Sequence, residues 1–211
     1  MFRPITGRPL RVAVLGAGRW GQSAHIPGWK RDPRVDLVAV CDVEQELAEQ
    51  AATAYGIPHA TTDFREVIAR DDVDVVDVCT PSHTHFELSM AALRAGKHLL
   101  CEKPVAFDFR DTLKAAGLAR EKGLKTKLGF TFRYSPAMLY MKELVDQGFC
   151  GEPFIYNAYE QNSQWLDPQT PLRQVDPESD QSEIQVSSLE GYGAPVIDLA
   201  RWMVGSDLTS V

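Results

Sequence analysis

Three features that define large classes of protein are scarce in this 211-residue sequence: long apolar runs, excess basic charge and paired cysteines. No run approaches the roughly 18 apolar residues of a transmembrane helix, so we expect no membrane partner. The formal net charge is -7, whereas a nucleic-acid-binding protein needs a basic face, so nucleic acid is not an expected partner either. The four cysteines show no CxxC or Cys/His spacing, which argues against a zinc site. The composition does not exclude a small-molecule ligand.

The N-terminal residues and the cysteines indicate where the protein resides. Residues 1–10 contain arginines and prolines but no apolar stretch, so they do not form a signal peptide. Cys41, Cys79 and Cys101 each end an apolar run, where a reduced cysteine behaves as a small hydrophobic residue. We therefore expect a cytoplasmic protein with free thiols.

Short apolar runs alternate with longer amphipathic segments from residue 10 to about residue 129. Strands are predicted at Leu10–Leu15, Val35–Cys41, Val73–Cys79, His98–Cys101 and Thr126–Phe130. Helices are predicted at Glu44–Tyr55, His83–Ala95 and Asp108–Lys122. Apolar strands joined by crossover helices predict an α/β domain over residues 1–130, with a doubly wound parallel sheet of the Rossmann type.

A second region, residues 131–211, has a different pattern and predicts the start of an incomplete α+β substrate and dimerisation domain. Helices are predicted at 135–148, with Ser135 as N-cap, and at 195–204, and strands at 154–159 and from 208 to the end. Residues 161–188 are polar and proline-containing, and too many for an ordinary connection. We expect a functional lid or a mobile loop there.

A glycine-rich turn follows the first predicted strand and opens a helix. Its sequence is Gly16-Ala17-Gly18-Arg19-Trp20-Gly21. In the dinucleotide-binding fingerprint the first glycine permits a tight turn, the second admits a pyrophosphate and the third lets helix and strand approach closely. The N-terminus of the helix then offers unpaired N–H groups to the phosphates. We expect these residues, with Arg19 and Trp20, to contact a dinucleotide.

Asp42, which ends the second predicted strand, is the expected acidic partner of this turn. Its carboxylate would accept hydrogen bonds from the adenosine ribose hydroxyls. A carboxylate there repels a 2′-phosphate and Val43 supplies no compensating cation, so NAD is expected in preference to NADP. The alternative is that the chain is an α/β domain that binds no nucleotide, in which the glycines form an ordinary turn and Asp42 is a surface residue.

Two further motifs resemble those of a known family. They are Thr80-Pro81-Ser82-His83-Thr84-His85 and Ala95-Gly96-Lys97-His98-Leu99-Leu100-Cys101-Glu102-Lys103-Pro104. With the glycine-rich turn, in this order and at this spacing, they resemble the Gfo/Idh/MocA family of glucose–fructose oxidoreductase and inositol 2-dehydrogenase relatives. The resemblance covers residues 11–156 and 193–205.

The resemblance implies roles for the motif residues. Thr80, Pro81 and His85 would line the cofactor, and Glu102 would hydrogen-bond the nicotinamide ribose. Lys103 would lie beside the reacting oxygen of the substrate, where a lysine can polarise a carbonyl or relay a hydroxyl proton. Arg133 and Tyr134 match the start of the second domain of the family, where such residues commonly face cofactor or substrate.

One stretch departs from the family. Many members carry Asp-x-Gly-x-His-x-x-Asp, whose first aspartate and histidine join the lysine in substrate binding and proton transfer. Here Gly191 stands for that aspartate and Pro195 for the histidine, and neither can carry a proton. Glu190 or Tyr192 is a candidate substitute, whereas Asp198 is expected to have a structural role.

The resemblance implies an NAD-dependent oxidoreductase that transfers a hydride between nicotinamide and a carbinol carbon of a sugar or polyol. The alternatives are a non-catalytic dinucleotide-binding sensor or regulatory protein of the same fold, and an inactive fragment. Family members continue through a large sheet, so the chain is expected to be C-terminally truncated relative to them. An exposed partial sheet also favours a homo-oligomer.

Overall fold

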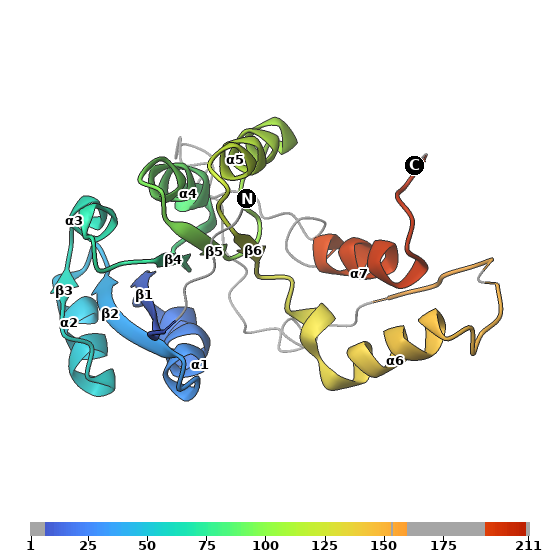
Figure 1. The fold of residues 1–211 in the computed structure, drawn as a ribbon, viewed down its shortest axis with the longest axis horizontal. Helices are drawn as coiled ribbons and strands as arrows, with labels where there is room; N and C mark the ends of the chain where they lie inside the picture. Colours follow the sequence, from blue (N-terminus) through green and yellow to red (C-terminus); the bar gives the residue numbers. More distant parts are fainter. Residues whose placement is uncertain (1–6, 153, 160–192, 210–211) are drawn as a thin grey trace, which may run out of the picture. The chain divides into compact units, whose positions relative to one another are not determined.

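The structure, a computed structural model, describes residues 7–152, 154–159 and 193–209 (Figure 1). Its contacts divide the chain into two compact units, Met1–Gly129 and Phe130–Val211. In the described part of the chain, none of the helices is long and apolar enough to cross a membrane.

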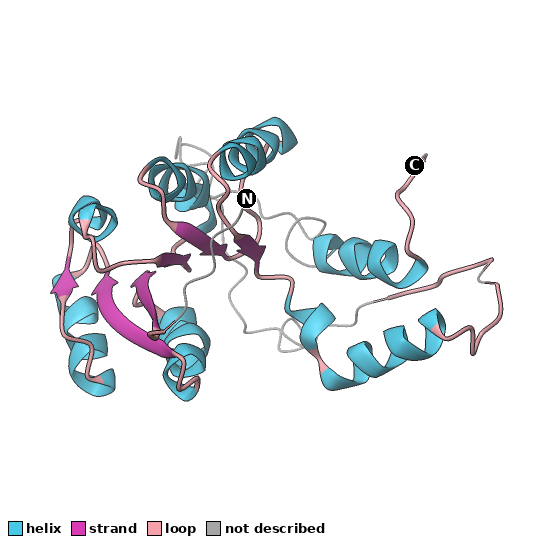
Figure 2. Cartoon of the chain, in the orientation of Figure 1, coloured by secondary structure: helices cyan, strands magenta, loops and turns pink. Residues whose placement is uncertain are grey.

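The first unit is built on one parallel sheet of six strands in the order β3-β2-β1-β4-β5-β6 (Figure 2). The strands are β1 Leu10–Leu15, β2 Val35–Cys41, β3 Ala60–Thr61, β4 Val75–Val78, β5 His98–Cys101 and β6 Thr126–Leu128. The chain moves outward from β1 to β3 and then returns to pair β4 with β1. This reversal creates a topological switch point between β1 and β4, where open α/β sheets bind ligands at their carboxyl ends.

Helices connect the strands of the first unit. A π-helical turn η1 Gly21–His25 leads into α1 Ile26–Arg31, and the later helices are α2 Gln45–Tyr55, α3 Phe64–Ala69, α4 His85–Arg94 and α5 Phe109–Glu121, with a 3-10 turn η2 Ser82–Thr84 before α4. Asp63 and Asp108 begin α3 and α5 as N-caps, because each side chain accepts a hydrogen bond from the backbone N–H two residues on.

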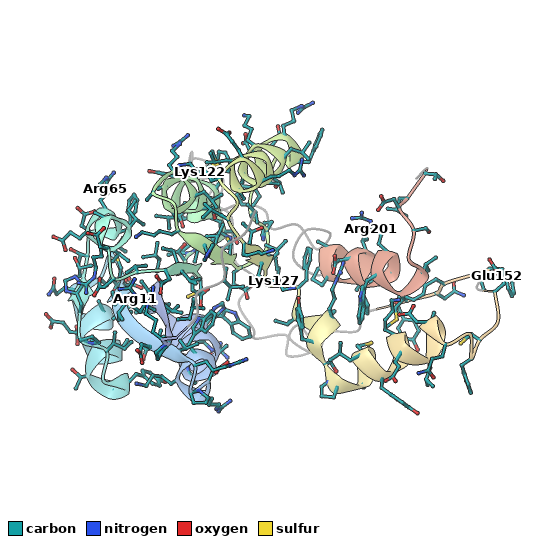
Figure 3. The ribbon with its side chains drawn as sticks, in the orientation of Figure 1. Arg11, Arg65, Lys122, Lys127, Glu152 and Arg201 are labelled. Atoms are coloured by element: carbon teal, nitrogen blue, oxygen red, sulfur yellow. The ribbon has the colours of Figure 1, made fainter. Side chains whose placement is uncertain are left out.

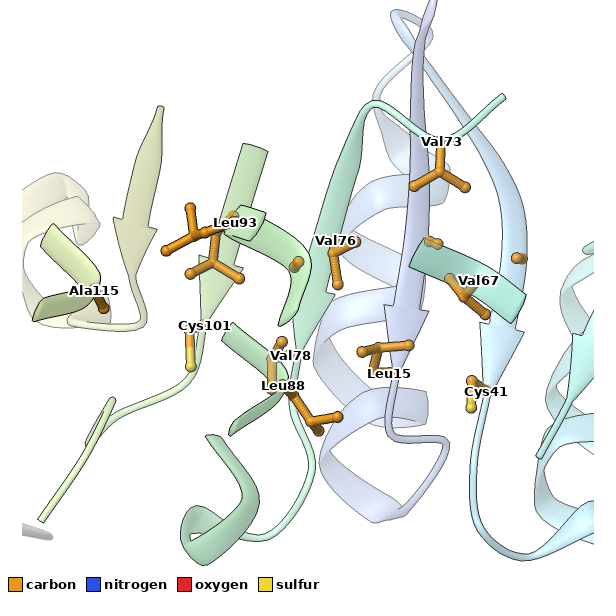
Figure 4. Packing of buried hydrophobic residues seen from close by; sticks show 14 of the residues in the cluster. Leu15, Cys41, Val67, Val73, Val76, Val78, Leu88, Leu93, Cys101 and Ala115 are labelled. Atoms are coloured by element: carbon orange, nitrogen blue, oxygen red, sulfur yellow. The ribbon is translucent and has the colours of Figure 1, made fainter. Parts of the chain in front are cut away.

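Alternate strand residues bury the two faces of the sheet in separate clusters. On one face Leu15, Val76 and Cys101 pack against residues of α3, α4 and α5, as Figure 4 shows. On the other face Val14 and Val40 pack with residues of α1 and α2. The sheet is therefore covered by helices on both faces, which confirms the Rossmann prediction.

The predicted elements of this unit differ from the observed ones mainly at four elements. The first, second and fifth strands have the predicted bounds, whereas β4 and β6 are shorter than the predicted runs. Both β3 and α3 were absent from the prediction, because a two-residue strand and a six-residue helix are too short to show a periodic pattern.

The second unit contains a 3-10 turn η3 Thr131–Tyr134, helix α6 Pro136–Asp146 and helix α7 Ala194–Val204, and Figure 3 shows their side chains. Both helices were predicted, and Ser135 is the N-cap residue of α6 although its side chain makes no capping bond. The strand predicted at 154–159 is wrong: these residues form no ladder, and Phe154 and Ile155 are exposed. An edge strand needs a neighbour, and the described residues of this unit supply none. The loop predicted at 161–188 lies outside the described residues, as does the end of the strand predicted from 208.

Candidate functional site

The glycine-rich turn lies at the carboxyl end of β1, and two of its glycines have no room for a side chain. Gly16 has φ +108°, and a Cβ there would lie 2.8 Å from the backbone carbonyl of Cys79. A Cβ on Gly21 would lie 2.2 Å from the carbonyl oxygen of Gly16. These contacts explain why only glycine fits, since backbone atoms cannot move aside.

Gly18 is different, because a Cβ there would meet no atom within 4 Å. The space beside it is open at the point where the helix begins. The turn therefore combines a rigid backbone with a cleared approach to helical N–H groups, which is what a pyrophosphate requires. The residues present fit a dinucleotide.

The carboxylate of Asp42 is held beside this turn at the end of β2. Its Oδ2 accepts a hydrogen bond from the N–H of Ala17 at 2.7 Å, and its Oδ1 accepts one from the N–H of Glu44 at 3.1 Å. The two bonds fix the side chain at the edge of the glycine-rich turn, where the fingerprint places its acidic residue.

The loop after β4 is tied to the loop after β5 by a buried histidine. The His85 ring is 1% exposed and lies 2.7 Å from the carbonyl oxygen of Pro104 and 2.8 Å from that of Thr80. Thr80 Oγ1 is 2.7 Å from Thr84 Oγ1. The ring therefore holds the backbone of Thr80, just before Pro81, and that of Pro104, and has little surface left to offer a ligand.

Glu102 follows β5 at the same edge of the sheet and is surrounded by donors. Its Oε1 accepts hydrogen bonds from Trp20 Nε1 at 3.1 Å and from His25 Nε2 at 3.3 Å, and its Oε2 accepts one from the N–H of Lys103 at 3.1 Å. A Cβ at residue 129 would lie 2.6 Å from Oε1, so Gly129 leaves room for the carboxylate. Lys103 is thereby placed next to Glu102, and its peptide bond to Pro104 is cis.

The sequence interpretation missed a second carboxylate behind Glu102. Asp77, in β4, is fully buried and accepts a hydrogen bond from Trp29 Nε1 at 2.6 Å. His25 Nδ1 lies 2.8 Å from its Oδ2, so the imidazole bridges Asp77 and Glu102. The signal was available: an aspartate inside an apolar parallel strand needs a buried donor, because an unpaired buried charge is costly.

The pKa values of this cluster are shifted in opposite directions. Burial by itself lowers the pKa of His25, but hydrogen bonds to Asp77 and Glu102 outweigh it and raise the pKa to about 9. Burial raises the pKa of Glu102, but hydrogen bonds from His25 and Trp20 outweigh it and lower the pKa. Near neutral pH the cluster therefore holds an imidazolium between two carboxylates.

The candidate residues of the second unit make contacts within that unit. Arg133 donates two hydrogen bonds to Asp198, at 2.6 and 2.5 Å, and its guanidinium lies 5.7 Å from the ring centre of Trp202. The bonds to Asp198 raise the pKa of Arg133. Tyr134 is half exposed, and Tyr192 lies outside the described residues.

A separate hollow of the first unit lies away from these residues. It has a volume of about 920 Å³ and is lined by residues that start the strands, among them Leu10, Val35, Val75 and His98. The glycine-rich turn, Asp42 and Glu102 lie at the opposite, carboxyl ends. We place the candidate site at those ends because helical N–H groups and the switch point converge there.

Comparisons with known proteins identify the family of the chain. The family model described as "Oxidoreductase family, NAD-binding Rossmann fold" (Gfo/Idh/MocA) matches residues 10–130. Levoglucosan dehydrogenase of Pseudarthrobacter phenanthrenivorans is 30% identical, and the match covers 93% of this chain and 51% of that protein. Inositol 2-dehydrogenase/D-chiro-inositol 3-dehydrogenase of Lactiplantibacillus plantarum is also 30% identical, over 95% of this chain and 54% of that protein. The chain thus spans about half the length of these relatives.

Solved structures give the same result. The scyllo-inositol dehydrogenase of Lactobacillus casei, solved with NAD(H) and scyllo-inositol, is 28% identical with a TM-score of 0.65 and covers 69% of this chain and 43% of its own. The structure of a myo-inositol dehydrogenase homologue from Sinorhizobium meliloti superposes with a TM-score of 0.73 at 25% identity, over 94% of this chain and 56% of its own. The family model covers more than half of the chain, and the glycine-rich turn, Asp42 and Glu102 all lie inside it. The chain therefore belongs to the Gfo/Idh/MocA family of NAD-binding oxidoreductases.

Proposed function

We propose that this chain is an NAD-dependent oxidoreductase that acts on a CH–OH group of a sugar, a polyol or a related compound. The observation that carries the proposal is the set of groups at the carboxyl ends of β1, β2 and β5. There a glycine-rich turn whose Gly16 and Gly21 have no room for a side chain, a fixed Asp42 and an ionised Glu102 meet at the carboxyl ends of the strands, in a fold whose family binds NAD.

Each group has a role in holding the cofactor. The N–H groups after Gly18 would bind the pyrophosphate, with Arg19 and Trp20 beside them. Asp42 would accept hydrogen bonds from the adenosine ribose and repel a 2′-phosphate, which favours NAD over NADP. Glu102 would accept one from the nicotinamide ribose, because its Oε2 has a single protein donor among the described residues.

Proton movement is assigned to Lys103. The cofactor, when bound, accepts or supplies the hydride, so the chain must only bind, orient and manage one proton. The side chain of Lys103, one residue after Glu102, would as an ammonium donate a proton to the carbonyl oxygen of a substrate in the reducing direction. In the oxidising direction it would as a neutral amine receive the proton of the substrate hydroxyl. The relatives are named for levoglucosan and inositol, which supports a polyhydroxylated substrate.

Binding is tested first. The purified chain is titrated in parallel with NADH and NADPH while tryptophan fluorescence is followed, since Trp20 lies in the glycine-rich turn. Saturable quenching at lower NADH than NADPH concentration is expected. Failure of both to bind would overturn the proposal, and tighter binding of NADPH would overturn the role of Asp42.

Turnover separates catalysis from a second function. Pro195, buried in the first turn of α7, and Gly191 replace the proton-carrying family residues, which favours a non-catalytic NAD-binding sensor as the alternative. Oxidation of sugars and inositols is assayed for the chain and for Lys103→Ala. Turnover that is lost in Lys103→Ala supports the enzyme, whereas tight NADH binding without turnover of any of these compounds supports the sensor.

We also propose a homo-oligomer in a reducing compartment such as the cytoplasm. All four cysteines are free thiols, and reduced cysteines are typical of that compartment. Light scattering of the purified chain tests the oligomer: a monodisperse mass of one chain would contradict it.

A further inference from the structure

The aspartate in β4 has no role in the proposed chemistry, although its position is costly. Asp77 is fully buried between apolar neighbours of the strand, where Val76 and Val78 are fully buried as well. Apolar residues would fill such a position without desolvating a charge. Its hydrogen bonds show what the carboxylate holds: Trp29 Nε1 at 2.6 Å and His25 Nδ1 at 2.8 Å.

His25 is held so that its other nitrogen points at Glu102. The residue ends the π-helical turn that begins at Gly21, and the N–H of Ile26, just after this turn, bonds to the carbonyl of Gly21. With Nδ1 on Asp77, Nε2 lies 3.3 Å from Glu102 Oε1, and the side chain is only 9% exposed. The ring is therefore a connection between a fully buried carboxylate and one that reaches the edge of the sheet.

We propose that His25 is a positioning residue for cofactor binding: anchored on Asp77, its imidazolium fixes the orientation and the negative charge of Glu102 for the nicotinamide ribose. The inference rests on the proposed function. Three groups donate hydrogen bonds to the Glu102 carboxylate. The indole of Trp20 and the backbone N–H of Lys103 are neutral donors, whereas the imidazolium of His25 is a charged donor. A charge-assisted bond holds a carboxylate more firmly than a neutral one.

Protonation of His25 follows from the groups that face it. Asp77 faces the ring from β4 and Glu102 from the end of β5, while the indoles of Trp20 and Trp29 carry no charge. The thiol of Cys79, just after β4, stays protonated, because burial and these two carboxylates raise its pKa. The imidazolium accordingly persists until the pH approaches about 9.

Calorimetric titration of the full chain with NADH and with ADP provides the test. ADP lacks the nicotinamide ribose and reports only on the glycine-rich turn and Asp42. In His25→Asn, NADH affinity should fall about tenfold while ADP affinity changes less than about twofold. The matched control His98→Asn changes the histidine at the opposite end of β5 and should leave both affinities unchanged.

The pH profile is the second readout and depends on a different variant. NADH affinity of the wild-type chain should hold to near pH 9 and then fall, and in Asp77→Asn the fall should begin at lower pH, because the ring loses its anionic anchor. This variant and the imidazole NMR titration of the wild-type chain keep the test valid if His25→Asn does not fold.

Each failure has its own signature. Wild-type binding of ADP but not NADH would overturn the proposed function and this inference with it. Two results for a wild-type chain that binds NADH would overturn the positioning role alone. The first is an NADH affinity that is unchanged in His25→Asn, and the second is a loss of NADH affinity in His25→Asn that is matched by an equal loss of ADP affinity. An unchanged pH profile in Asp77→Asn would overturn the anchoring role of Asp77.

Discussion

Helix α4 of the first unit and helix α6 of the second have a similar amphipathic pattern but are buried to different extents. In the first unit, α4 buries Leu88, Ala92 and Leu93 against the sheet. In the second unit, α6 buries none of its residues within the described structure, and Leu139 and Tyr140 are exposed. An amphipathic pattern therefore predicts a helix, whereas the elements that pack against the helix decide how much apolar surface it removes from water.

The largest difference is expected from one leucine in each unit. Leu93→Ala removes a fully buried side chain and should lower the free energy of unfolding by about 4 kcal/mol, because a cavity remains. Leu139→Ala removes a half-exposed one and should cost less than about 0.5 kcal/mol. Urea denaturation followed by circular dichroism measures both. Equal losses would show that α6 is buried in solution as deeply as α4.

A pH change should act on the first unit through His25. Its folded pKa of about 9 lies above the ordinary value of 6.5, so its stabilisation is complete below pH 6.5 and is lost as the pH rises through 9. The loss should be roughly 3 kcal/mol in the free energy of unfolding. Urea denaturation from pH 6 to pH 10 measures it, with His25→Asn as the control that lacks this component. If the free energy of unfolding changes with pH in the same way in the wild-type chain and in the variant, the charged cluster of His25, Asp77 and Glu102 does not stabilise the fold.

A smaller effect is expected in the second unit, from the bond that fixes α7. Asp198→Asn leaves Arg133 without its anionic partner and should cost about 1 kcal/mol, because Arg133 is one-third exposed. Faster amide hydrogen exchange in α7, with unchanged exchange in α4 and α5, is the expected result. Unchanged exchange in α7 would show that the ion pair contributes nothing to that helix.

The smallest stability effect is expected at Gly18. A Cβ there meets no atom, so Gly18→Ala should change the free energy of unfolding by less than about 0.5 kcal/mol. NADH affinity should nevertheless fall about tenfold, because the methyl group occupies the proposed pyrophosphate approach. The control Gly28→Ala, also in open space but in α1, should leave NADH affinity unchanged. Equal affinities in all three proteins would place the pyrophosphate elsewhere.

Strands β1, β2, β4 and β5 were predictable because each is a largely apolar run bounded by a turn. β2 was predicted to the residue, since Val35–Cys41 is a largely apolar run that is flanked by polar residues. β3 and α3 were not predictable, because their few residues gain their structure from neighbours: the N–H of Val40 bonds to the carbonyl of His59, and Asp63 caps α3. In the second unit, residues 154–159 have a strand-like pattern but no partner strand among the described residues, so the prediction from the pattern alone was wrong.

The site was predictable where a motif fixes the backbone and not where side chains meet across the fold. The glycine-rich turn and Glu102 follow from local sequence. The contact of His25 with Asp77 joins residues 52 positions apart, and only the register of β1 with β4 brings them together. An aspartate within Val75–Val78 is the one clue that the sequence offers to this cluster.

The four cysteines differ in a way that makes the chain suitable for selective labelling. Burial raises the pKa of the Cys41 and Cys101 thiols to about 12 and that of Cys79 further still, so these thiols are poor nucleophiles at neutral pH. Cys150, after α6, is exposed. A maleimide dye should therefore attach at a single position in the second unit and leave the thiols of the sheet unmodified.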